Sequence, residues 1–296
     1  MIIVIDSGGT KSDLLLVDQE REGRHLSEHY TTTGINPTVM NAAELVENIR
    51  QWKSCLQHDS PAWGDSGQPQ AVTRAYWYCA GCRDEVRHQL EEAFHAVFPN
   101  VVVEVCSDLV GAARALYGRQ PGIACILGTG SNSGYYDGHT IMLNTPPLGY
   151  ILGDEGSGAA LGRQLINTLY KMPQAKELCS AFEQWRGLTL PKLIDRVYHQ
   201  PRPNAFLASL VPFISQHITN PLMKEMVTEE FRCFARRNLQ PYLLEQGVTH
   251  VAAVGGVACT FEEQLSEALH EEGFELTHTL KAPVERLGNY HLGIEY

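Results

Sequence analysis

Residues 2–18, IIVIDSGGTKSDLLLVD, hold two apolar runs on either side of a short polar turn. The run at residues 2–5 predicts a buried strand that ends at Asp6. Residues 7–11, SGGTK, predict a turn that bulky side chains could not make, and the apolar pattern returns at residues 14–17. The stretch therefore predicts a β-hairpin with a polar tip.

The tip of this hairpin carries groups that bind phosphate and metal ions. Backbone N–H groups at Gly8 and Gly9, the Thr10 hydroxyl and the Lys11 amine can surround a phosphate, while Asp6 can hold a metal ion through water. The turn is not a Walker loop, because the Gly-x-x-x-x-Gly-Lys-Ser/Thr spacing is absent and a strand follows it. An ordinary tight turn with polar residues is the alternative interpretation.

A second stretch repeats this design. Residues 126–133, ILGTGSNS, can be laid over residues 5–12 so that Ile126 matches Ile5, Gly130 matches Gly9 and Ser133 matches Ser12. An apolar run again precedes the turn, and a polar and aromatic strand follows it. Two such hairpins in two halves of one chain suggest a duplicated domain that holds one polyphosphate from both sides.

Length and composition limit the class of protein. A chain of 296 residues exceeds what one core usually organises, so two domains are expected. The hydrophobic fraction of 44% and the charged fraction of 19% are typical of a globular protein. No apolar run is long enough to cross a membrane and no signal peptide precedes the first strand, so we expect a cytoplasmic protein without a membrane partner.

Charge and cysteine content argue against two further classes. The formal net charge of −11, without a cluster of Lys and Arg, makes nucleic acid an unsuitable partner. The eight cysteines are scattered apart from Cys79 and Cys82, so we expect mostly buried free thiols, with a redox or metal role for this pair as the minor alternative.

Several other polar residues follow predicted strands or turns. Asn36 precedes a proline, which holds it extended and presents its amide. Asp108 follows the strand at residues 101–105 and precedes a helix expected from Leu109, where it can cap the helix or meet a ligand at the carboxyl end of the strand. Asp154, within the glycine-rich stretch 149–158, can match the helix dipole or approach a ligand.

The second half of the chain ends with a similar ambiguity. A strand at residues 250–254 runs into Gly255 and Gly256, which can present backbone to a flat ring or simply form a close strand-to-helix turn. The segment between about residues 160 and 245 predicts a helical insertion, and residues 283–296 predict a short helix.

Five motifs in order resemble the N-acetylglucosamine kinase and BadF/BadG/BcrA/BcrD ATPase-like family of the actin, Hsp70 and sugar-kinase superfamily. They are DSGGTK at residue 6, SD at 107, GTGSN at 128, GDEGS at 153 and GGVA at 255. The resemblance covers nearly the whole chain. It implies an α/β protein with two ribonuclease-H-like domains, residues 1–118 completed by the helix 283–296, and residues 119–282 with the helical insertion. ATP and Mg²⁺ would lie in a cleft between the domains.

The same resemblance implies roles for individual residues. Asp108 matches the catalytic base and Asp6 the carboxylate on the magnesium side. The residues that match the ATP-binding loops are Gly8, Gly9, Thr10, Lys11, Gly128, Thr129, Gly130, Ser131, Gly255 and Gly256. The residues that match the sugar-binding side are Asn36, Thr129, Asn132, Gly149 and Asp154.

We therefore expect an ATP-dependent kinase of an amino sugar of the N-acetylglucosamine type, with the sugar and ATP as its small-molecule partners. A carboxylate can accept the proton of a sugar hydroxyl while amides and Mg²⁺ stabilise the charge on the transferred phosphate. The alternatives are an ATPase that activates a dehydratase and a sugar or nucleotide sensor without catalysis. The oligomeric state stays open, with a homodimer as one outcome.

Overall fold

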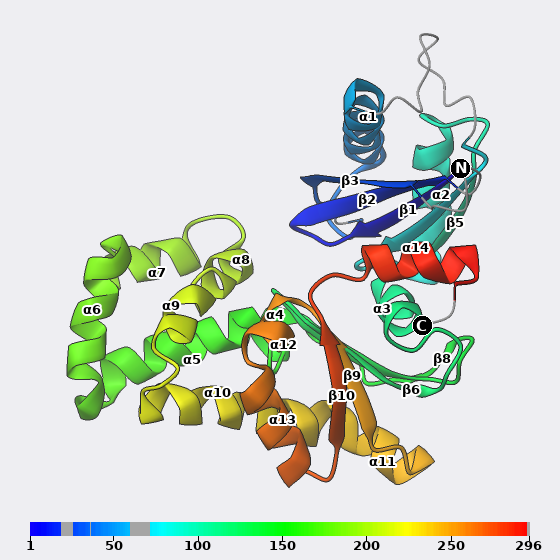
Figure 1. Cartoon of the computed structure of the whole chain (residues 1–296). Helices are drawn as coiled ribbons and strands as arrows, with labels where there is room; N and C mark the ends of the chain where they lie inside the picture. Colours follow the sequence, from blue (N-terminus) through cyan, green and yellow to red (C-terminus); the bar gives the residue numbers. More distant parts are fainter. Residues whose placement is uncertain (19–25, 36, 60–71, 295–296) are drawn as a thin grey trace. The chain divides into compact units, whose positions relative to one another are not determined.

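The computed structural model describes residues 1–18, 26–35, 37–59 and 72–294 (Figure 1). Two compact units divide the chain: Met1–Arg119 with Pro283–Tyr296, and Gln120–Ala282. The chain therefore leaves the first unit once and returns to it at its C-terminal end.

The described residues of the first unit form a five-stranded mixed sheet and four helices. Its strand order is β3-β2-β1-β4-β5. The elements are β1 (Ile2–Ser7), β2 (Lys11–Asp18), β3 (Leu26–Thr33), α1 (Ala42–Asp59), β4 (Arg74–Cys79), α2 (Asp84–His95), β5 (Val102–Ser107), α3 (Asp108–Tyr117) and α14 (Val284–Leu292).

The alternation of side chains along β1 and β2 decides which helices cover which face of this sheet. Ile5 lies opposite Leu14, and both belong to the core beneath α1 and α2. In that core the edge of Trp52 from α1 meets the ring of Trp77 from β4, with centroids 5.2 Å apart. Leu15 packs on the opposite face against α14, where a Cβ on Gly288 would lie 2.6 Å from its Cδ2.

A chain of hydrogen bonds attaches α14 to the sheet. Arg114 Nη1 donates to the Tyr78 hydroxyl at 2.9 Å, and that hydroxyl lies 2.8 Å from His291 Nε2. The Tyr76 ring stacks on the imidazole, with centroids 3.5 Å apart. Because the phenol oxygen accepts from Arg114, its proton is available to His291, which can accept it only as neutral imidazole.

This attachment predicts a loss of stability in mild acid. Burial, and then the nearby Arg114 charge, lower the pKa of His291 from 6.5 to about 4. The unfolded chain therefore binds the proton first, so the stabilisation is complete above pH 6.5 and declines as the pH falls towards 4. Between pH 7.5 and pH 5 we expect His291 to remove about 2 kcal/mol from the free energy of unfolding.

Urea unfolding of the wild type and of His291→Gln at the two pH values tests this expectation. Glutamine keeps an acceptor for Tyr78 but does not titrate, so the variant should lose less stability on acidification. Equal losses in the two proteins would contradict it.

The second unit repeats the sheet of the first. Its order is β10-β9-β6-β7-β8, and the equivalent pairs of strands are parallel or antiparallel as in the first sheet. The strands are β6 (Gly122–Leu127), β7 (Ser131–Tyr136), β8 (Ile141–Asn144), β9 (His250–Val254) and β10 (Glu275–Leu280). The duplicated α/β fold expected from the two hairpins is confirmed.

Helices separate β8 from β9 and β9 from β10. They are α4 (Gly149–Leu152), α5 (Gly158–Lys171), η1 (Pro173–Ala175), α6 (Lys176–Arg186), α7 (Leu190–Tyr198), α8 (Pro203–Ala208), α9 (Val211–Gln216), α10 (Pro221–Phe234), the π-helical η2 (Ala235–Leu239), α11 (Gln240–Gln246), α12 (Gly256–Thr260) and α13 (Glu262–Glu271). Figure 1 shows α6 and α7 grouped away from the strands. None of the helices in the described ranges is long and apolar enough to cross a membrane.

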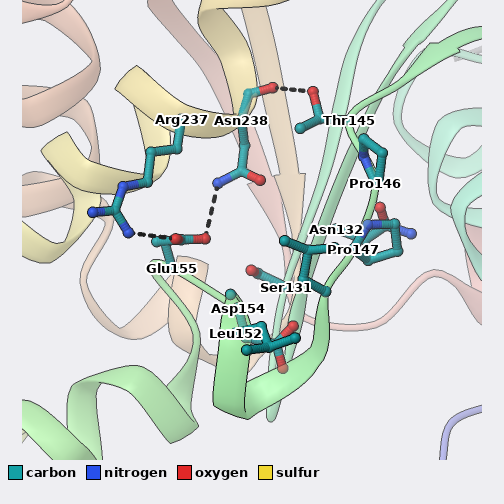
Figure 2. A pocket seen from close by; sticks show the side chains of 12 residues that line it. Ser131, Asn132, Thr145, Pro146, Pro147, Leu152, Asp154, Glu155, Arg237 and Asn238 are labelled. Atoms are coloured by element: carbon teal, nitrogen blue, oxygen red, sulfur yellow. Dashed lines mark hydrogen bonds and ion pairs between the residues drawn. The ribbon is translucent and has the colours of Figure 1, made fainter.

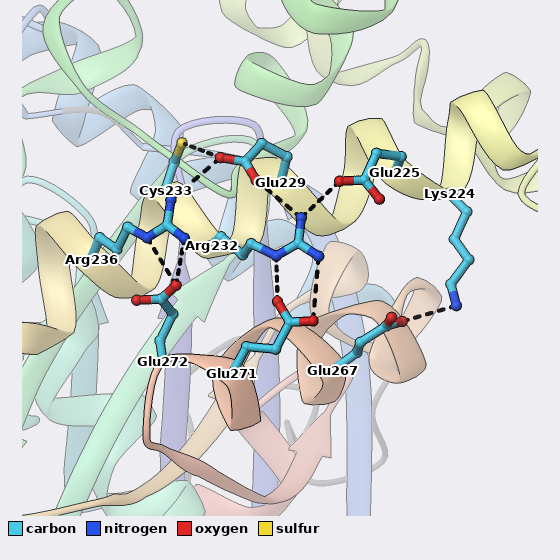
Figure 3. Close-up of polar contacts among 9 residues, drawn as sticks. All are labelled: Lys224, Glu225, Glu229, Arg232, Cys233, Arg236, Glu267, Glu271 and Glu272. Atoms are coloured by element: carbon cyan, nitrogen blue, oxygen red, sulfur yellow. Dashed lines mark hydrogen bonds and ion pairs between the residues drawn. The ribbon is translucent and has the colours of Figure 1, made fainter.

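A network of ion pairs joins α10 to α13 (Figure 3). Arg232 bonds to Glu225 and Glu229 of its own helix and to Glu271 of α13. Arg236 reaches Glu272 at 2.7 Å. Isolated exposed pairs contribute little, but three carboxylates around one guanidinium that is only 15% exposed form a connected network that aligns the two helices.

Two short helices were not predicted. The strand β9 is followed first by α12, which starts at Gly256, and a break at Phe261 separates it from α13. The short helix α4 was not predicted, since four residues with an exposed apolar surface give no periodic signal.

Candidate active site

The turn between β1 and β2 is closed by a hydrogen bond and packed against one buried glycine. The N–H of Gly8 donates to the carbonyl of Lys11 at 2.9 Å, and the N–H of Gly34 donates to the carbonyl of Thr10 at 3.2 Å. A Cβ on Gly34 would lie 2.3 Å from the Gly8 carbonyl oxygen and 2.6 Å from the Lys11 and Thr10 nitrogens. Only glycine therefore allows the chain after β3 to support this turn.

Two half-buried carboxylates lie at the carboxyl ends of parallel strands in the first unit. Asp6 is the next-to-last residue of β1, and Asp108 follows β5 as the first residue of α3. Burial and the charge of Asp108 raise the pKa of Asp6 to about 7, and burial raises that of Asp108 to about 6. The charge of Asp108 acts on Asp6, as expected for carboxylates at the same edge of one sheet.

Asp108 does not cap α3. The cap is Ser107, whose Oγ accepts a hydrogen bond from the Val110 N–H at 3.3 Å, so the capping interpretation of Asp108 was wrong. Asp108 Oδ1 instead accepts from the Leu109 N–H at 2.9 Å. Because serine supplies the cap, α3 does not need Asp108 for this purpose.

Asp13 is a further carboxylate that the sequence interpretation missed. Its side chain is 2% exposed and accepts from Lys11 Nζ at 2.7 Å and Thr31 Oγ1 at 2.8 Å. Burial raises its pKa, but the hydrogen bonds from Lys11, Thr31 and His29 and the Lys11 charge together lower it overall. Asp13 lies opposite Asp6 in the hairpin, so counting residues back from the turn could have placed it beside Asp6 and Lys11.

The turn between β6 and β7 is one residue shorter than the first. The Gly128 N–H donates to the Gly130 carbonyl, which leaves only Thr129 between them, whereas two residues separate the paired Gly8 and Lys11. The sequence match therefore does not hold through the turn. The N-terminus of α5 supports this loop, since the N–H groups of residues 158 and 159 donate to the carbonyls of Gly128 and Thr129.

Asp154 lies over this second turn in a strained backbone conformation. Its φ of 58° is left-handed, which is uncommon for a residue with a side chain. A Cβ on Gly130 would lie 2.9 Å from Asp154 Oδ2. Burial raises the pKa of Asp154, and a hydrogen bond from the Ser131 backbone partly opposes the rise. The cap of α5 is Ser157, and no acidic residue lies in its first turn, so Asp154 does not serve the helix dipole.

A pocket of about 260 Å³ in the second unit brings part of the predicted sugar side together (Figure 2). It is lined by Ser131, Asn132, Thr145, Pro146, Pro147, Leu148, Leu152, Gly153, Asp154, Glu155, Arg237 and Asn238. Thr129 and Gly149 do not line it; Gly149 begins α4 instead. The insertion residues Arg237 and Asn238 were not predicted, because nothing local links them to the glycine-rich stretch.

The two glycines after β9 differ in their surroundings. Gly255 has a φ of 131°, and a Cβ there would lie 2.2 Å from the carbonyl oxygen of Leu127 at the end of β6. A Cβ on Gly256 would meet no atom within 4 Å. Close packing explains Gly255, while Gly256 leaves open space beside the second turn.

Comparison with solved structures decides the family. The chain is 40% identical to a protein from Porphyromonas gingivalis provisionally assigned as an N-acetylglucosamine kinase, with a TM-score of 0.88 over 99% of both chains. The chain belongs to the N-acetylglucosamine kinase-like family. The predicted resemblance is confirmed.

Two more distant structures share the fold of this N-acetylglucosamine kinase-like protein. A Chromobacterium violaceum protein with the same provisional assignment has a TM-score of 0.67 at 18% identity over 98% of both chains. A Schistosoma mansoni hexokinase complexed with glucose has a TM-score of 0.55 at 12% identity, over 99% of this chain and 85% of the hexokinase. Neither family models nor curated proteins give a match.

Three further points of the sequence analysis of this kinase-like protein concern Asn36, the cysteines and metal ligands. Asn36 lies outside the described residues. All eight cysteines are free, and burial raises the pKa of Cys79 to about 12, so this thiol stays protonated and weakly reactive. Within the described part of the chain, no group of three or more His, Cys, Asp and Glu side chains could hold a metal ion.

Proposed function

We propose that the protein transfers the γ-phosphate of ATP to a hydroxyl of an amino sugar of the N-acetylglucosamine type. The observation that carries this proposal is the 40% identity, over 99% of both chains, to a provisionally assigned N-acetylglucosamine kinase. The half-buried carboxylates and the two glycine turns supply the groups that such a transfer needs.

The first unit would supply the base and hold part of the nucleotide. Asp108 accepts the proton of the sugar hydroxyl, and its raised pKa of about 6 still leaves it mainly ionised at pH 7. The turn of Gly8, Gly9, Thr10 and Lys11 would lie against the phosphates, with the Thr10 hydroxyl and the Lys11 amine as donors.

Mg²⁺ fits this donor set. The ion usually keeps several waters and binds one or two carboxylates with the substrate phosphates, so Asp6 is sufficient without a cluster of three ligands. After burial, the negative charges of Asp108 and Asp13 raise the pKa of Asp6. A bound cation would offset this repulsion between carboxylates. When bound, Mg²⁺ would neutralise charge on the phosphates.

The second unit would bind the sugar and the rest of the nucleotide. Asn132 and Asp154 line the 260 Å³ pocket and can bond to sugar hydroxyls, which makes this the acceptor pocket of the proposal. Gly128, Thr129, Gly130 and Ser131 would hold phosphate.

The resemblance also places other residues on these ligands. Gly255 and Gly256 stay predicted for the adenosine, and Asn36, Thr129 and Gly149 for the sugar. The cytoplasmic location and the homodimer likewise stay predictions.

The deciding experiment measures ADP release by the purified protein with Mg-ATP, first without an acceptor and then with single sugars. We expect release only with an amino sugar, N-acetylglucosamine, glucosamine or N-acetylmuramic acid, and formation of the sugar phosphate in equal amount. ADP release without any sugar would instead support the ATPase alternative. No release with any sugar would overturn the proposal.

A further inference from the structure

The π-helical turn η2 interrupts the helical run from α10 to α11, and its position is explained by a proline. Pro241 has no N–H for the carbonyl of Arg237, four residues earlier, and its ring would crowd that carbonyl in a regular α-helix. The wider turn at Ala235–Leu239 relieves the conflict. Such turns cost helix stability and are frequent at functional sites.

This turn sends two neighbouring arginines to different partners. Arg237 Nη1 lies 2.7 Å from Glu155 Oε1 in the wall of the acceptor pocket (Figure 2). Arg236 bonds to Glu272 at the end of α13 (Figure 3). The chain thus contains two arginines of the same turn, of which one faces the pocket and the other does not.

Asn238 binds both sides of the acceptor pocket. Its Nδ2 lies 3.4 Å from Glu155 Oε2, and its backbone carbonyl accepts from Thr145 Oγ1 at 2.8 Å (Figure 2). Tyr242, one turn later, accepts from the Thr145 N–H at 2.8 Å and donates to the carbonyl of Ser133 at 2.9 Å. The segment from η2 into α11 therefore connects the two walls.

Glu155 links Arg237 and Asn238 to Asp154, the neighbouring residue that is predicted to bind the sugar. Its side chain is 12% exposed. Burial raises its pKa, but the hydrogen bonds from Arg237, its own backbone and Asn238, together with the Arg237 charge, lower it overall. The next N–H, of Gly156, donates to the buried carboxylate of Glu230. Asp154 precedes these anchored residues with a left-handed φ, a conformation that persists only when its surroundings impose it.

We propose that Arg237 and Asn238 are positioning residues of the acceptor pocket: they hold Glu155 and thereby orient Asp154 towards a sugar hydroxyl. The inference rests on the proposed function for the identity of the ligand. The support itself, from η2 to the stretch 153–156, is independent of the ligand.

The test compares Arg237→Ala with Arg236→Ala as its matched control. We expect the KM for the best amino sugar to rise about tenfold in Arg237→Ala, because a charged hydrogen bond in the pocket wall is lost, while the KM for ATP stays unchanged. Arg236→Ala should leave both KM values near wild type. In a Glu155→Gln background, Arg237→Ala should add little, since the two residues act as one unit.

A second measurement separates this inference from the proposed function. Hydrogen exchange of the amides at residues 153–156 should accelerate in Arg237→Ala and not in Arg236→Ala, whether or not any sugar is phosphorylated. Unchanged exchange in both variants would overturn the positioning role. Faster exchange with an unchanged sugar KM would overturn it as well, because the support would not then serve the acceptor. Absence of sugar-dependent ADP release in the wild type would count against the proposed function alone.

Discussion

Asp108→Asn should lower kcat by roughly 10²- to 10⁴-fold while the protein stays folded and still binds the sugar. An amide cannot take the hydroxyl proton, but its oxygen can keep the bond from the Leu109 N–H. The helix cap is not affected, because Ser107 provides it. Turnover, sugar affinity and melting temperature measured on this variant test the expectation.

Ser107→Ala is the matched control. It removes the cap of α3 and should cost about 0.5–2 kcal/mol of stability, while kcat falls far less than in Asp108→Asn. A variant at 108 with near-wild-type turnover on the best sugar would remove Asp108 from the mechanism. A loss of turnover in Ser107→Ala as large as that in Asp108→Asn would show that the effect comes from displacement of α3.

Gly34→Ala adds only one methyl group, but we expect it to raise the KM for ATP strongly. The new methyl group would overlap backbone atoms of Gly8, Thr10 and Lys11, and backbone cannot rotate away as a flexible side chain can. The first turn must therefore move, which we expect to cost about 1–3 kcal/mol of stability and to raise the KM for ATP by roughly 10²-fold. The sugar KM should change less.

Gly9→Ala provides the comparison for stability, because nothing lies within 4 Å of its Cβ position in the same turn. Thermal unfolding of both variants would measure the cost of the clash, and steady-state kinetics of Gly34→Ala and the wild type with varied ATP would measure nucleotide use. An ATP KM in Gly34→Ala equal to that of the wild type would show that the turn tolerates displacement, or that it does not contact the nucleotide.

The fold could be predicted because its signals are local and repeated. The apolar run before Asp6 and the run before Gly128 each form the central strand of a sheet, and glycine marks the turn after both. The two carboxylates Asp6 and Asp108 could be paired in advance, since side chains at the carboxyl ends of parallel strands meet at one edge of a sheet.

What could not be predicted depends on contacts between distant segments. Glu155 and Arg237 are separated by most of the helical insertion, and no periodic pattern connects them. The cap of α3 was misplaced by one residue, because serine and aspartate both cap helices and only the geometry distinguishes them. The sequence match between the two hairpins did not reveal that the second turn is shorter. The length of each turn depends on how the backbones of its two strands pair.

The return of α14 to the first unit has a consequence for the order of folding. A chain is synthesised from its N-terminus, and domains generally fold as units during synthesis. Leu15 and Val17 of β2 contact Gly288 of α14, which leaves the ribosome only after all of Gln120–Ala282. The first unit is thus completed only after the inserted unit has been synthesised. Until then, part of one face of its sheet stays uncovered, whereas the inserted unit can already fold.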